Sequence, residues 1–189
     1  FTSDHGEMMG SQGVPPKQKQ VPWDESAKVP FLIRGPSVQG GRAVDLPINT
    51  PDIFPTLAGL AGVSAPESVE GEDFSQLIRG RAPDKEHDAL YMGVAPFMMR
   101  PFRREYRAIR GIAYTYARAI EGPWLLYDNE EDPYQMNNLA GNPDYANLQK
   151  DMESRLQIRL AEVGDDFRPA AEYIAEYGYS ITANEIGRA

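Results

Sequence analysis

The sequence predicts an α/β arrangement followed by a small α+β subdomain with an antiparallel sheet and a long helix. Three observations predict this fold class. An apolar run and then a helical pattern occupy the first half, four short aromatic-rich runs follow from residue 89, and apolar side chains recur every four residues across 144–163. We therefore expect two units, residues 1–88 and residues 89–189.

The first unit begins with a loop and alternates strand and helix. Residues 8–28 are rich in Gly, Pro, Gln and Lys and predict a long loop. Val29–Arg34 is a short apolar run before Gly-Pro and predicts a buried strand. A helix is predicted from Thr50, a capping residue, to Gly62, with a second short helix at 73–79.

The second unit predicts an antiparallel meander packed with one long helix. Its strands are expected at Ala89–Val94, Tyr106–Arg110, Ile112–Arg118 and Trp124–Tyr127. A helix over 144–163 follows Asn-Pro and ends at Gly164, and a last short helix is expected at 170–177.

Composition excludes several classes of function. The 189-residue chain carries a net charge of -9, which disfavours nucleic acid as a partner, because phosphate backbones require clustered Lys and Arg. The absence of Cys excludes disulfides, Cys-ligated zinc and a Cys nucleophile. No apolar run reaches the ~18 residues of a membrane span. The compartment stays open between cytoplasmic and periplasmic or secreted.

The pair Asp4-His5 is the candidate metal-binding feature. Adjacent side chains on a regular strand point to opposite faces, so both reach one cation only where the strand ends, and Gly6 permits a turn there. The alternative is that both side chains form hydrogen bonds within a loop. The loop that follows carries Lys17 and Lys19, whose ammonium groups suit an oxyanion or lie in solvent as surface charges.

Several other polar and aromatic residues are expected to be structural. The meander residues Tyr91, Arg107, Trp124 and Tyr127 are predicted to pack its core. The acidic stretch 128–138 lacks the spacing of a calcium loop and is interpreted as a structural turn, and His87 is expected to be exposed in a linker.

The order of these segments resembles the sulfatase family of the alkaline-phosphatase superfamily. The resemblance is carried by FTSDHGEMMGSQG, KQ and PWDESAKVPFLIRGP, then by LPINTPDIFPTLAGLAGV, VEGEDFSQLIRG and GPWLLYDNEEDPYQMNNLA. These motifs cover nearly the whole chain. The resemblance implies that the first unit is the C-terminal part of an alkaline-phosphatase-like α/β domain.

The resemblance also implies a divalent-metal site and an anion-binding lysine. Asp4 and His5 match the second pair of metal ligands in the family. The expected cation is Ca²⁺, with Mn²⁺ as the alternative because an imidazole nitrogen suits Mn²⁺ better than Ca²⁺. Lys19 matches the sulfate-binding lysine, with Lys17 as the alternative. The chain contains no C/S-x-P-S/A-R motif, so the formylglycine nucleophile and the other metal ligands are expected in an N-terminal portion missing from this chain.

The function expected from the resemblance is sulfate-ester hydrolysis by a metal-dependent formylglycine mechanism. The expected partners are a small-molecule or carbohydrate sulfate ester and the N-terminal part of the same protein. Two alternatives stay open: a phosphonate or phosphate ester hydrolase of the same superfamily, and a non-catalytic fragment. The isolated chain is expected to be inactive, because it holds no nucleophile.

Overall fold

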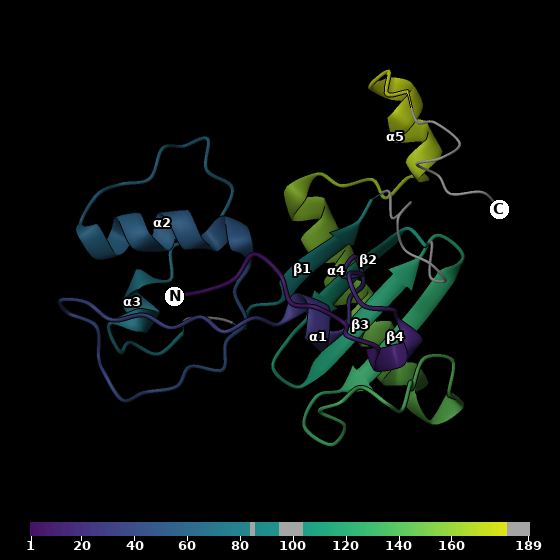
Figure 1. The fold of residues 1–189 in the computed structure, drawn as a ribbon, viewed down its shortest axis with the longest axis horizontal. Helices are drawn as coiled ribbons and strands as arrows, with labels where there is room; N and C mark the ends of the chain where they lie inside the picture. The colour runs from purple at the N-terminus through teal and green to yellow at the C-terminus, as the bar shows by residue number, and fades with distance from the viewer. Residues whose placement is uncertain (84–85, 95–103, 181–189) are drawn as a thin grey trace.

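The computed structural model describes residues 1–83, 86–94 and 104–180, and it confirms the predicted fold class (Figure 1). Four strands form one antiparallel sheet, with helices around it and two further helices beside it. In chain order the elements are η1 (Ser11–Gly13), α1 (Asp24–Ala27), α2 (Thr50–Ala61), α3 (Ser75–Ile78), β1 (Ala89–Gly93), β2 (Tyr106–Arg110), β3 (Tyr114–Ala119), β4 (Gly122–Asp128), η2 (Pro143–Tyr145), α4 (Ala146–Val163) and α5 (Ala170–Glu176).

The sheet is a simple meander of order β1-β2-β3-β4, as predicted. Its side chains alternate between two buried faces. On one face, Ile109, Tyr116 and Leu126 pack against the apolar side of α4. α4 ends at Gly164, whose φ of 68° is the left-handed conformation that glycine tolerates best. Helix and meander therefore form one core, set by local patterns in the sequence.

The other face of the sheet is covered by the segment before α2. Met8, Val14, Val21 and Trp23 are buried against a set of sheet residues, namely Tyr106, Ala108, Ala117, Leu125 and Tyr127. The Trp23 indole N–H donates to the Tyr127 hydroxyl at 3.1 Å. Residues 8–28 were predicted as a loop. They are mostly irregular, but they also contain the short helices η1 and α1.

The predicted strand at Val29–Arg34 is not a strand in this structure. Only Leu32 in this run pairs like a strand residue: its backbone N–H donates to the Phe1 carbonyl at 2.8 Å, and its carbonyl accepts from the Phe1 amino group at 2.7 Å. A strand requires a ladder of such bonds, and Leu32 is 64% exposed. The sequence identified this apolar run, but the prediction that the run is buried was wrong.

Helix α2 is tied to the sheet edge by Asn49. Asn49, and not Thr50, is the residue before the helix, and its N–H donates to Asp52 Oδ2 at 2.6 Å. The Asn49 side-chain amide also bonds both backbone groups of Leu90 in β1, at 2.6 and 2.8 Å. The prediction for His87 was wrong: it is buried, its Nδ1 lies 2.9 Å from the Pro47 carbonyl, and its ring contacts Phe74 edge-on.

Arg107 and Glu153 attach the C-terminal elements to the sheet. Arg107 is 1% exposed, donates to both carboxylate oxygens of Asp165 at 2.7 and 3.1 Å, and stacks on Phe167. Glu153 of α4 accepts hydrogen bonds from the Tyr116 hydroxyl at 2.6 Å and from Arg118 at 2.9 Å. The prediction that Arg107, Tyr127 and their neighbours pack the meander is confirmed.

Glu153 predicts a specific dependence of stability on pH. Burial raises the pKa of its carboxyl, but hydrogen bonds from Tyr116, Gln157 and Arg118 outweigh burial and hold this pKa below its ordinary value of 4.5. Because the pKa of Glu153 is lower in the folded state, its stabilising effect is present at pH values above the ordinary pKa. This effect is lost as the pH falls through the lowered pKa of the folded state.

We therefore expect the free energy of unfolding to fall less steeply in Glu153→Gln than in the parent protein as the pH drops from about 5 to about 3. Urea unfolding followed at several pH values measures this difference. Glu121→Gln, an exposed carboxylate in the β3-β4 turn, is the matched control and should follow the parent curve. Parallel curves for the Glu153 variant and the parent would contradict the assignment.

Candidate functional site

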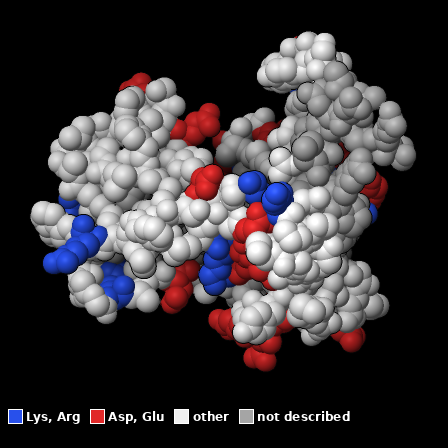
Figure 2. Space-filling model, viewed as in Figure 1, with Lys and Arg blue, Asp and Glu red and all other residues white. Residues whose placement is uncertain are grey.

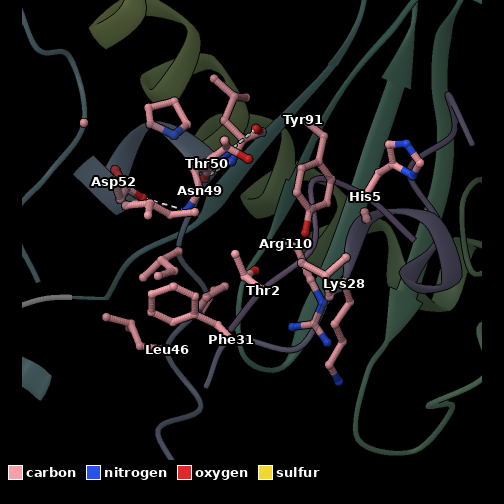
Figure 3. A pocket seen from close by; sticks show the side chains of 18 of the residues that line it. Thr2, His5, Lys28, Phe31, Leu46, Asn49, Thr50, Asp52, Tyr91 and Arg110 are labelled. Carbon is pink, nitrogen blue, oxygen red and sulfur yellow. Dashed lines mark hydrogen bonds between the residues drawn. The ribbon is translucent and has the colours of Figure 1, made fainter. Parts of the chain in front are cut away.

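A broad open groove collects the side chains that the sequence singled out. Its walls come from the start of the chain, the segment around Lys28, the residues before α2, and the strands β1 and β2 (Figure 3). Asp4, His5 and Lys19 all line this groove, and Lys17 is not among its lining residues. The structure thus brings three of the four predicted site residues to one surface.

Gly6 fixes where the Asp4-His5 pair lies. The Gly6 N–H donates to the Ser26 carbonyl at 2.7 Å, and a Cβ on Gly6 would sit 2.0 Å from the Glu25 carbonyl oxygen. Only glycine allows the backbone to approach α1 this closely. The sequence argument gave Gly6 the role of permitting a turn, whereas the structure uses it for close packing against α1.

The His5 ring is oriented so that one nitrogen is available to a ligand. Its Nδ1 lies 2.7 Å from the Gly6 carbonyl, which makes Nδ1 the protonated nitrogen and leaves the lone pair on Nε2. Nε2 is 3.4 Å from Asp4 Oδ2. Asp4 Oδ1 accepts from the His5 backbone N–H at 3.0 Å and from the Ser3 hydroxyl at 3.3 Å. One oxygen and one nitrogen therefore converge.

This donor set fits two ligands of a divalent cation. A metal-bound histidine typically donates its other N–H to a carbonyl, as His5 does to Gly6. Hydrogen bonds from the backbone amides of Asp4 and His5 lower the pKa of the Asp4 carboxyl, which favours the ionised form that binds metal. Within the described parts of the chain, no cluster of three or more His, Asp or Glu side chains is suitable for a metal ion.

The two lysines differ in their surroundings. The Lys19 carbonyl accepts a hydrogen bond from the Ser26 hydroxyl, so its backbone is anchored on α1, beside Gly6. Both lysines are exposed, and Lys17 has a left-handed φ of 69°. Lys19 therefore shares both the groove and the anchoring helix with Asp4 and His5.

Three further residues line the groove: Lys28 and Arg110, which sequence reasoning missed, and Tyr91, which it assigned only to the packing of the meander (Figure 3). Arg110 donates to both oxygens of Asp24, at 2.9 and 3.0 Å. Burial raises the pKa of Tyr91 to about 12, opposed by Arg110 and increased by Asp24. A sequence signal existed only for Lys28, which directly precedes the apolar run at 29–34; the other two depend on how the sheet meets α1.

Comparison with known proteins identifies the family. Residues 17–162 match the family described as N-sulphoglucosamine sulphohydrolase, C-terminal. The chain belongs to the sulfatase family. This sulfatase chain is the C-terminal portion of the family's fold, in the alkaline-phosphatase superfamily, as its motifs predicted.

Two sulfatases are similar to this chain over most of its length. The ulvan-active sulfatase of Formosa agariphila is 49% identical over 98% of the chain. The Delta 4,5-hexuronate-2-O-sulfatase of Bacteroides thetaiotaomicron is 30% identical over 88% of the chain. The sulfatase chain spans only 37% and 35% of these two relatives.

A solved structure outside the sulfatases is also similar. The phosphonate monoester hydrolase of Agrobacterium radiobacter superposes with a TM-score of 0.65 and 30% identity, over 86% of the sulfatase chain and 34% of that enzyme. Proteins similar to this chain therefore include both sulfatases and a phosphonate monoester hydrolase.

The surface of the sulfatase chain is mixed in charge on the face shown in Figure 2. Lys and Arg side chains there lie among Asp and Glu, around the junction between the α2 region and the sheet. None of the helices in the described parts of the chain combines the length and apolarity that crossing a bilayer requires.

Proposed function

We propose that the protein containing this chain is a sulfuric ester hydrolase, and that the chain supplies one side of its active site. The observation that carries the proposal is the convergence of Asp4 Oδ2 and His5 Nε2 at 3.4 Å in a groove shared with Lys19, within a chain of the sulfatase family. Because the chain spans about a third of its relatives, the nucleophile, a formylglycine, and the other metal ligands are assigned to an N-terminal portion.

Each residue has one proposed task. Asp4 and His5 hold a divalent cation, Ca²⁺ in the first instance and Mn²⁺ as the alternative because of the imidazole ligand. When bound, the cation polarises the sulfate ester. The Lys19 ammonium binds a sulfate oxygen and stabilises the charge that develops on the leaving oxygen. Gly6 holds both features against α1.

The proposed substrate is a sulfated carbohydrate. The name of one relative specifies a hexuronate, which is a sugar, as the sulfated compound. The groove itself is open, and its lining combines apolar side chains with polar ones from several segments, so that a sugar ring and its hydroxyl groups both find partners there.

A phosphonate or phosphate ester hydrolase is the second candidate function. The observation that favours it is the similarity to the phosphonate monoester hydrolase, together with the imidazole in the ligand pair. The fold alone does not decide between these substrates, since one scaffold hosts both chemistries.

Side-by-side rates separate the two functions. We expect the complete protein to have a kcat/KM at least about tenfold higher on 4-nitrophenyl sulfate than on a 4-nitrophenyl phosphonate ester, a difference of about 1.4 kcal/mol in activation free energy. Steady-state assays at matched pH and metal concentration measure it. The reverse order would support the phosphorus-ester alternative, and no turnover of either substrate by the complete protein would support a non-catalytic role.

The ligand pair predicts metal content. Asp4→Ala and His5→Ala should each weaken divalent-metal binding by at least about tenfold, because each removes one ligand atom. Metal per protein after dialysis, measured by elemental mass spectrometry, reads this directly and independently of activity. Asp151→Asn, an exposed carboxylate on α4, is the matched control. Full metal content in both ligand variants would refute the assignment.

The two lysines are separated by their single variants. We expect Lys19→Ala to lower kcat/KM on an aryl sulfate by about 10²–10³-fold, the size of effect seen when one charge-stabilising donor is removed. Lys17→Ala should change it by less than about threefold. If the effects are reversed, Lys17 is the sulfate-binding residue and the alternative assignment holds.

A further inference from the structure

The groove extends beyond the metal pair to a cluster of side chains that the proposed chemistry does not use. Lys28, Tyr91 and Arg110 form this cluster, together with Asp24, and the three basic or hydroxyl groups line the groove. The inference drawn from it rests on the proposed function, because it concerns another part of the same substrate.

Backbone pairing places Lys28 beside the metal pair. Phe1 and Leu32 exchange two backbone hydrogen bonds, and the Gly6 N–H donates to the Ser26 carbonyl. The segment 26–32 therefore runs antiparallel beside residues 1–6, and Lys28 lies in the part of this segment that faces the Asp4-His5 pair. The Lys28 side chain is 65% exposed on the groove side.

The charges of the cluster leave Lys28 available. Both oxygens of Asp24 already accept from Arg110, at 2.9 and 3.0 Å, whereas Lys28 Nζ is 3.9 Å from Asp24 Oδ2. Two cations thus share one carboxylate, so the cluster carries one net positive charge. The third donor of Arg110, on its other terminal nitrogen, is used by the Gly111 carbonyl. Arg110 therefore positions Asp24, and Lys28 is the groove-lining cation of the pair whose ammonium has no close hydrogen bond to Asp24.

Tyr91 supplies a neutral donor next to this charge. Its ring projects from β1 and its hydroxyl points toward Arg110, with Lys28 beside the guanidinium (Figure 3). Within the described parts of the chain, the Tyr91 hydroxyl makes no hydrogen bond to a protein group. An ammonium and a phenol hydroxyl side by side suit an oxyanion, with the ammonium providing charge and the hydroxyl providing direction.

We propose that Lys28 and Tyr91 form a subsite for a second anionic group of the substrate, a carboxylate or a second sulfate on the sugar next to the cleaved ester. Lys28 binds its charge and Tyr91 donates a hydrogen bond to it. The subsite determines specificity: it raises affinity for dianionic sugars and takes no part in the cleavage of a simple aryl sulfate.

Paired substrates test this proposal in the complete protein. The first pair is a monosulfated disaccharide with a uronic acid and the same disaccharide with its carboxyl reduced to an alcohol; the second pair is a disulfated and a monosulfated monosaccharide. We expect Lys28→Met to raise KM about five- to tenfold for the dianionic member of at least one pair, with kcat within about twofold. Tyr91→Phe should raise the same KM about threefold. The pair that responds tells carboxylate from sulfate.

The monoanionic substrates and a rescue variant distinguish loss of the subsite from a purely structural effect. The carboxyl-reduced disaccharide, the monosulfated sugar and 4-nitrophenyl sulfate should keep the parent KM in both variants, and Lys28→Arg should restore the dianionic substrate. Lys150→Met, an exposed lysine on α4, should change none of them. An equal loss on all substrates, or a fall in kcat on the aryl sulfate, would overturn the subsite and assign Lys28 to the cleaved sulfate or to the fold.

Failure of the proposed function gives a different pattern. In that case the parent protein hydrolyses no sulfate ester at all. The subsite is then tested by isothermal titration calorimetry with the same sugar pairs. Tighter binding of the dianionic sugar to the parent, lost in Lys28→Met, supports it, and equal binding of both members refutes it.

Discussion

The arrangement of the chain depends on the need to cover both faces of a four-stranded sheet. α4 covers one face, and the segment from Met8 to Trp23 covers the other, with Trp23 hydrogen-bonded to Tyr127 at its end. An uncovered face would expose a continuous apolar surface formed by Tyr106, Leu125 and their neighbours. The segment that carries Lys19 and follows Asp4-His5 is therefore held in place by the sheet, although it has little secondary structure of its own.

Buried hydrogen bonds between distant segments add to this apolar packing. Gln135 is 1% exposed; its side-chain oxygen accepts from the Asp24 N–H at 2.8 Å and its backbone carbonyl accepts from the Gln12 side chain at 3.0 Å. Asp24 in turn holds Arg110. The acidic stretch 128–138, which was predicted as a structural turn, thus holds α1 in place through Gln135 and so positions the groove beside it. Buried polar groups of this kind stabilise only when every partner is present, so the groove and the turn at 128–138 depend on each other.

Local patterns predicted the elements that are stable through their own periodicity. The helices at 50–61 and 146–163 and the four strands were found within a few residues of their observed ends. The failures share a cause. Val29–Arg34 lacks strand partners in this structure, Asn49 caps α2 while bonding β1, and His87 is buried by Pro47 and Phe74. Each outcome depends on residues distant in sequence, which a window of a few residues does not contain.

The sequence by itself determined the family, the order of elements and the candidates Asp4, His5 and Lys19, because motif spacing and periodicity are properties of a linear chain. Only the tertiary structure decided that Asp4 and His5 converge, that Gly6 serves close approach to α1, and that Lys28, Tyr91 and Arg110 share their groove. The physical reason is that direction and distance between side chains follow from packing of the two sheet faces, which brings residues more than a hundred positions apart into contact.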